Sequence, residues 1–139
     1  ISEWSPILTL PGITFINLQY QDFVDDLTQV KNELGVTVHN FDDLDHYDNL
    51  LDVAALSAAL DIVVSTKNTV PLITAGVGTL TKLANWRQSD WNNILFNPVG
   101  PSLDIFERNT WEPWGNTFRL IAADIVKLKN KTSDLGESL

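Results

Sequence analysis

The segment Ala58–Val70 reads AALDIVVSTKNTV and decides the fold expected for this chain. Its run Asp61–Ser65 has an apolar, β-branched centre, Ile62–Val64, as expected for a central parallel strand buried on both faces. The run stops at a cluster of hydroxyl and amide side chains, and Pro71 marks the first turn of a helix. In an open α/β sheet, ligands bind where strand carboxyl ends meet helix amino ends. The segment therefore predicts an α/β fold with a binding site directly after this strand.

Strand and helix patterns alternate along the rest of the chain. Short β-branched runs predict strands, and apolar residues at helical spacing predict helices. The expected strands cover 13–18, 36–39, 61–65, 79–84 and 103–108, and the expected helices cover 22–34, 50–59, 70–77 and a last segment, with Asp22 and Asn116 as caps of the first and last. Such alternation is typical of a three-layer Rossmann-like domain with a mostly parallel sheet of about five strands. We expect this single domain over 1–131 and a flexible tail over 132–139.

The composition limits the classes of partner. The chain has 139 residues, 44% of them hydrophobic, and a net charge of −9. This acidic balance argues against nucleic acid, because phosphates require Lys and Arg. No window approaches the ~20 apolar residues of a membrane span. Cysteine is absent, which permits a reducing cytoplasm, and we predict that location. Methionine is also absent, even at position 1, so we expect a piece of a longer protein.

The loop after the central strand is the leading candidate site. Ser65, Thr66, Lys67, Asn68 and Thr69 combine hydroxyls, an amide and an ammonium beside a helix start. Unpaired N–H groups and the helix dipole at such a start suit a diphosphate. An equally weighted interpretation is ordinary capping of the first helical N–H groups.

The end of the first strand offers a second set of polar side chains. Gln19 and Tyr20 follow that strand, which places them at the same edge of the sheet. They are candidate ligand contacts, and turn formation with helix capping is an equally weighted alternative.

Other polar and aromatic groups favour structural interpretations. The acidic loop 42–48 with His46 matches no calcium motif, so we expect a solvated turn and no metal site. His39 lacks a nucleophile or carboxylate at a recognisable spacing, and no catalytic residue is assigned. Four late tryptophans could stack on a base or sugar, but packing is the favoured interpretation. They are Trp86, Trp91, Trp111 and Trp114.

Several segments together resemble a known family. Leu10–Tyr20, LPGITFINLQY, resembles a family motif "LPGVxFVxLQYGD", and Ala59–Ser65 resembles "ALDLVIS". Thr69–Gly78 resembles the helix of "DTSVAHLAGALGKP", and Ile105–Arg108 with Trp111 resembles the closing "LFRQ…W". In this order and spacing, the segments resemble the C-terminal half of a heptosyltransferase-type glycosyltransferase (glycosyltransferase family 9), of the variety fused to tetratricopeptide repeats in bacteria.

The resemblance implies a GT-B enzyme in which this half binds a nucleotide-sugar donor and no separate cofactor. The N-terminal GT-B half or the tetratricopeptide repeats would lie elsewhere in the parent chain. Because the other half usually supplies the catalytic base, the isolated fragment would be inactive. The donor contacts would come from Gln19, Tyr20 and the loop Ser65–Thr69.

The chain also departs from the family pattern. Lys67 and Asn68 replace an Asp-Thr pair, Leu72 replaces a His, Leu80 replaces a Pro, and Gln21 replaces a Gly. These changes remove polar groups that the family places around its donor. The alternative prediction is therefore a non-catalytic binding or scaffold domain that keeps the fold and has lost the donor-site motif.

Overall fold

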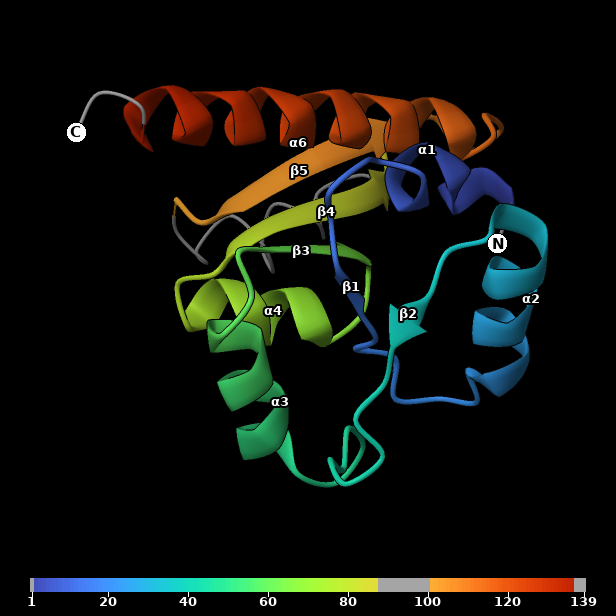
Figure 1. Ribbon diagram of the computed structural model, residues 1–139, viewed down its shortest axis with the longest axis vertical. Helices are drawn as coiled ribbons and strands as arrows, with labels where there is room; N and C mark the ends of the chain where they lie inside the picture. Colours follow the sequence, from blue (N-terminus) through green and yellow to red (C-terminus); the bar gives the residue numbers. More distant parts are fainter. Residues whose placement is uncertain (1, 88–100, 137–139) are drawn as a thin grey trace.

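The computed structural model describes residues 2–87 and 101–136 and has an α/β architecture (Figure 1). All strand pairs among these residues are parallel. The elements, in chain order, are η1 Ser2–Trp4, α1 Ser5–Leu8, β1 Phe15–Ile16, α2 Val24–Leu34, β2 Val38–His39, α3 Leu50–Ala58, β3 Ile62–Thr66, α4 Val70–Gly76, β4 Leu80–Trp86, β5 Leu103–Arg108 and α6 Gly115–Gly136.

The strands form two sheets, which corrects the expectation of one sheet of about five. β1 pairs with β2, and a second sheet has the order β3-β4-β5. In the part of the chain described, no backbone hydrogen bond joins β1 to β3. Ile13 and Phe15 instead pack their side chains against the core cluster that lies beneath α6. The first strand therefore meets the larger sheet through side chains, and its backbone edge stays open.

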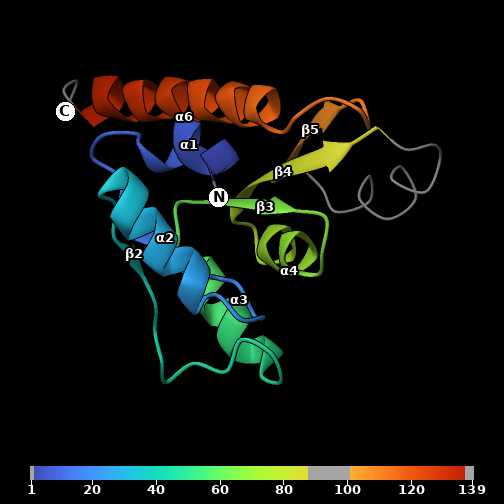
Figure 2. The same cartoon turned by 90° about the vertical axis from the view of Figure 1, so that its right-hand side faces the viewer.

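The larger sheet lies between two layers of helices. α6 and α1 cover one face, and α4 covers the other, with α3 packed beside α4 (Figure 2). The main core lies under α6 and consists of buried apolar side chains from α1, β4 and α6. They are Ile7, Ala84, Phe118, Ile121, Ala122 and Ile125. This face holds most of the apolar burial, so it anchors the sheet that carries β3.

The N-terminal segment forms a helical turn that the sequence patterns above do not include. Pro6 lies in the first turn of α1, where its missing N–H group is not needed. The Trp4 ring lies 4.3 Å from the Phe118 ring, centroid to centroid. The Glu3 carboxylate accepts a hydrogen bond from the backbone N–H of Trp114 at 2.7 Å. These contacts attach the first residues to α6.

Several helix ends differ from the expectation. Phe23 occupies the N-cap of α2 with no side-chain cap, so the cap predicted at Asp22 is wrong. α6 begins at Gly115, which puts Asn116 inside its first turn. The same helix continues to Gly136, into the segment 132–139 that was expected as a tail; residues 137–139 lie outside the described part. Over 2–87 and 101–136, no helix combines the length and apolarity that crossing a bilayer requires.

Candidate functional site

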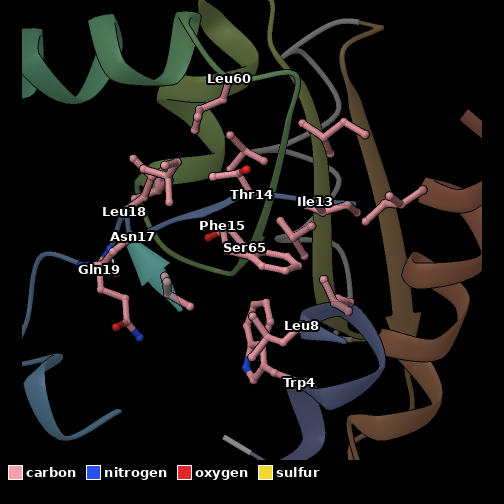
Figure 3. Close-up of a pocket in the computed structure, with 18 of the residues that line it drawn as sticks. Trp4, Leu8, Ile13, Thr14, Phe15, Asn17, Leu18, Gln19, Leu60 and Ser65 are labelled. Atoms are coloured by element: carbon pink, nitrogen blue, oxygen red, sulfur yellow. Dashed lines mark hydrogen bonds between the residues drawn. The ribbon is translucent and has the colours of Figure 1, made fainter. Parts of the chain in front are cut away.

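An open cleft of about 1130 Å³ separates β1 from β3. Every residue from Gly12 to Asp22 and from Leu60 to Thr66 lines it. Side chains alternate between the two faces of a strand, so an unbroken run of lining residues means that the strand edge itself borders the space. Figure 3 shows Ile13, Phe15 and Ser65 around this cleft.

The walls of the cleft are apolar and come from three helices. Trp4 and Leu8 approach from the N-terminal turn, as Figure 3 shows, Leu27 from α2, and Ile125 and Leu128 from α6. The contribution of the N-terminal turn was missed in the sequence. The sequence does contain a signal for a helix start there: Ser5 is followed by Pro6 and then by the apolar pair Ile7–Leu8.

The predicted site residues divide into two groups. Gln19, Tyr20, Ser65, Thr66 and Asn68 all line the cleft. The other two, at 67 and 69, do not line it. The ends of the first and third strands therefore line one cleft, but they belong to two sheets and not, as expected, to one edge of a single sheet.

The first turn of α4 uses its N–H groups internally. The Asn68 side chain accepts a hydrogen bond from the Val70 N–H at 2.9 Å, and Pro71 has no N–H group. The Leu72 N–H donates to the Thr69 carbonyl at 3.1 Å, and the next N–H donates to the same carbonyl at 3.3 Å. This is the capping interpretation, and it leaves this turn with no spare N–H group for a phosphate.

The remaining groups of that loop also have local contacts. The Ser65 hydroxyl lies 3.1 Å from the Thr66 carbonyl and 3.5 Å from the Asn68 side-chain oxygen. The Lys67 ammonium lies 5.7 Å from the centre of the Trp86 ring, a cation–π distance. The positive charge of the loop is thus directed at an aromatic ring on β4.

Gln19 connects the cleft to the acidic loop 42–48. Its N–H donates to Asn17 at 3.0 Å, and its side-chain amide donates to Asp26 at 3.4 Å. Its carbonyl lies 3.2 Å from Nδ1 of His46. A carbonyl only accepts, so this nitrogen carries the proton. The contact spans 27 residues of sequence, and no local pattern could have predicted it.

The charge inside the cleft is mostly negative. Asp22, Asp26 and Asp61 line it. Lys129 is the one cation among the described lining residues, and its ammonium donates to the Pro11 carbonyl at 2.7 Å. This balance opposes an anionic ligand and favours a neutral or cationic one.

The loop 42–48 folds around a carboxylate. Asp45 accepts the N–H groups of Tyr47 and Asp48 at 2.9 and 2.8 Å, and these bonds hold the pKa of that carboxyl below its usual value. Within residues 2–87 and 101–136, no group of three or more His, Cys, Asp or Glu side chains is placed to hold a metal ion.

Two of the late tryptophans are packing residues. The Trp86 and Trp114 rings lie 6.3 Å apart, and the Arg108 guanidinium lies 4.0 Å from the centre of the Trp114 ring. Trp111 is 83% exposed. Trp91 lies outside the described residues, as does most of the loop around it.

The comparisons with known proteins place one curated protein beside this chain. Protein FlbA of Caulobacter vibrioides is 35% identical to it over 117 residues, which cover 79% of this chain and 19% of FlbA. The chain thus spans about a fifth of the length of that relative. No family model matches the chain, and no solved structure matches it.

These comparisons correct the family expected from the resemblance. The relative found bears a name that describes no glycosyltransferase, and nothing found indicates glycosyltransferase family 9, a GT-B enzyme, tetratricopeptide repeats or nucleotide-sugar binding. The physical reason lies in the quoted motifs. The apolar residues that carried the resemblance are those any buried parallel strand requires. The polar positions that would define the donor site, at Gln21, Lys67, Asn68 and Leu72, already departed from the pattern.

Proposed function

We propose that this chain is a non-catalytic binding domain whose site is the cleft between β1 and β3. The observation that carries the proposal is the cleft itself, which is bordered by two strand edges and walled by apolar side chains. A concave, mostly apolar space with a few convergent polar groups is the usual form of a binding site. In a continuous Rossmann-like sheet the first and third strands would pair, and the proposed site is the space that separates them here.

The chemistry of the lining supports binding over catalysis. Amide, hydroxyl and carboxylate groups supply the polar contacts, and no histidine is among the described lining residues. The lining lysine, Lys129, is held by a backbone carbonyl. Nucleophilic catalysis requires a base in hydrogen-bond contact with the nucleophile. Among the described residues, the Ser65 hydroxyl contacts the Thr66 carbonyl and the Asn68 side chain, and Asp26 accepts from Gln19. The groups gathered here are better suited to holding a ligand in place.

The ligand of this proposal carries no phosphate. The first turn of α4 donates its N–H groups to Asn68 and Thr69, and three carboxylates face the cleft. Phosphate binding at a helix start depends on free N–H groups and a favourable local charge. We therefore expect no nucleoside diphosphate to bind.

A fluorescence titration with Nile red, a neutral dye, tests the proposal. Thr14 precedes β1, is exposed and lines the cleft, whereas Thr37 precedes β2, is exposed and does not line it. We expect the unchanged protein and Thr37→Trp to bind the dye equally. Thr14→Trp should bind it at least about tenfold more weakly, because the indole occupies the cleft. Equal binding by both variants would contradict the proposal.

A thermal-shift series with uridine diphosphate tests the excluded ligand class. A ligand that binds only the native state adds about 2.7 kcal/mol of stability at a hundredfold excess over its Kd. We expect no change in Tm with the nucleotide. A rise in Tm that Thr14→Trp abolishes would show that the cleft accepts phosphate after all.

A further inference from the structure

We infer that the natural occupant of the cleft is an extended polypeptide segment with apolar and basic side chains, which adds as a strand to the free edge of β3. This inference rests on the proposed function and names the class of partner for the same site. It draws on the hydrogen-bonding state of β3, on the size of the cleft and on its charge.

The outer edge of β3 has unused backbone groups. β3 pairs with β4 over Ile62–Thr66, and no other backbone hydrogen bond of these residues is found within 2–87 and 101–136. In a strand, alternate residues direct their N–H and C=O groups to opposite sides. Half of these groups on β3 therefore face the cleft, which every residue from Leu60 to Thr66 lines. An exposed strand edge of this kind is a template for another strand.

The opposite side of the cleft is a second strand edge. β1 pairs only with β2 among the described residues, and Gly12–Asp22 lines the cleft without interruption. A segment lying between β1 and β3 thus meets backbone groups on both sides. Main-chain hydrogen bonds then provide affinity, and the apolar walls receive alternate side chains of the segment.

The size of the cleft also favours a peptide. Its volume of about 1130 Å³ exceeds the ~300–1,000 Å³ of typical small-ligand pockets. Its apolar lining runs from α1 past α2 to the C-terminal half of α6. An elongated occupant fits such a trough better than a compact one.

Charge complementarity selects basic side chains in the partner. Asp22, Asp26 and Asp61 line the cleft, and Lys129 already donates to a backbone carbonyl. The chain as a whole has a net charge of −9. Lys or Arg at the ends of the segment would meet these carboxylates and accelerate association at low salt.

Calorimetric titration with a synthetic peptide tests the inference. The probe is a blocked nine-residue peptide that alternates Val with Thr between terminal and central lysines. We expect it to bind the unchanged protein and Thr37→Trp, and to bind Thr14→Trp at least about tenfold more weakly. Two further peptides carry N-methyl groups on one or the other alternate set of residues. At least one of them should bind about tenfold more weakly, because it cannot donate to β3.

A charge reversal supplies a second protein variant. Asp61 is exposed and lines the cleft, and Asp48 is exposed and does not. We expect Asp61→Lys to weaken peptide binding about fivefold at low salt, and Asp48→Lys to leave it unchanged. A peptide with Glu in place of Lys should reverse the order of the two variants.

The outcomes separate this inference from the proposed function. If Nile red binds in a manner sensitive to Thr14→Trp and the peptide does not bind, the cleft is a site and the peptide partner is wrong. Equal affinities for the parent and both N-methylated peptides would overturn strand addition. If neither probe binds, both proposals fail. The peptide series needs no protein variant, so it decides the matter even where Thr14→Trp fails to fold.

Discussion

Lys82 is a buried cation that contacts two carboxylates. It lies on β4 with 2% of its side chain exposed, and its ammonium contacts Asp104 at 2.5 Å and Asp124 at 2.6 Å. Burial alone would lower the pKa of Lys82, but the hydrogen bonds to the two carboxylates outweigh burial and raise it above the usual 10.5. One cation thereby connects β4, β5 and α6.

Replacing this cation should reduce stability at neutral pH. We expect Lys82→Met to lower the free energy of unfolding by about 2 kcal/mol, less than for a fully buried pair, because Asp104 and Asp124 are 50% and 35% exposed and can be rehydrated. Chemical denaturation measures the change. Lys31→Met, on the exposed side of α2, is the control and should change it by less than about 0.5 kcal/mol.

The pH dependence of this difference follows from the raised pKa. As the pH rises, the folded state keeps the proton on Lys82 after the unfolded chain has lost it. The contribution of Lys82 to the free energy of unfolding is therefore complete below pH 10.5 and decreases as the pH rises through the folded pKa. We expect the gap between the original protein and Lys82→Met to stay constant up to about pH 9 and to narrow over the range above pH 10.5. A gap that stays constant over this range would contradict the assignment.

At the residue scale, the sequence predicts which side chains lie at the strand ends but not how their charges are used. Gln19 follows the first expected strand and Ser65 ends the third, and both line the cleft, although their strands belong to two sheets. The pairing of Lys82 with Asp124 crosses 42 positions of sequence, and no local pattern contains it. Lys82 lies within the strand 79–84 expected from the sequence, and a lysine in a strand is predicted to be exposed unless its carboxylate partners are known.

At the scale of single elements, chain reversals depend on backbone conformation. Gly35 follows α2 with a φ of +69° and nothing within 4 Å of an added Cβ, so this helix ends at Leu34, the end of the expected helix 22–34. Gly76 is the last residue of α4, has no positive φ, and also has open space around it. The two glycines therefore isolate the effect of the left-handed conformation from that of crowding.

A matched pair of substitutions tests this difference. We expect Gly35→Ala to lower the free energy of unfolding by about 1 kcal/mol, because an L side chain is strained at that φ. Gly76→Ala should raise it by about 0.5 kcal/mol, because alanine loses less backbone entropy in a helix. Urea denaturation at one pH compares them. No loss of stability in Gly35→Ala would show that α2 does not end as described.

Strand length was the least predictable property of the elements. The expected strand 103–108 coincides with β5, whereas the expected strand 13–18 pairs over only Phe15–Ile16. β5 has a complete neighbour in β4, from Thr81 to Trp86. β1 has a short partner and an open edge, and its residue Phe15 packs against the core under α6. A fully paired strand and a briefly paired one have the same apolar pattern in the sequence, so only long-range packing distinguishes β5 from β1.

At the scale of the whole molecule, the N-terminal turn packs against the start of α6. Trp4 packs on Phe118, and Glu3 accepts the Trp114 N–H across 111 positions of sequence. The turn Ser2–Leu8 also supplies one wall of the cleft. The N-terminal segment therefore supports the fold and the site together.

Truncating Trp4 tests this role. We expect Trp4→Ala to lower the free energy of unfolding by about 2 kcal/mol, because a partly buried indole loses its contact with α6. Trp111→Ala is the control, since that side chain is 83% exposed, and it should change stability by less than about 0.5 kcal/mol. Thermal and urea unfolding give the values. An equal loss of stability in both variants would show that the N-terminal turn does not belong to the core.

The separation of the two sheets is the claim on which the site depends, and amide exchange with cross-strand NMR contacts measures it most directly. In the free protein, we expect one alternate set of the Ile62–Thr66 amides to be protected by β4 and the other set to exchange quickly into the cleft. We also expect no backbone contacts between β1 and β3. Uniform protection across β3, together with backbone contacts from Phe15–Ile16 to β3, would show one continuous sheet with no cleft.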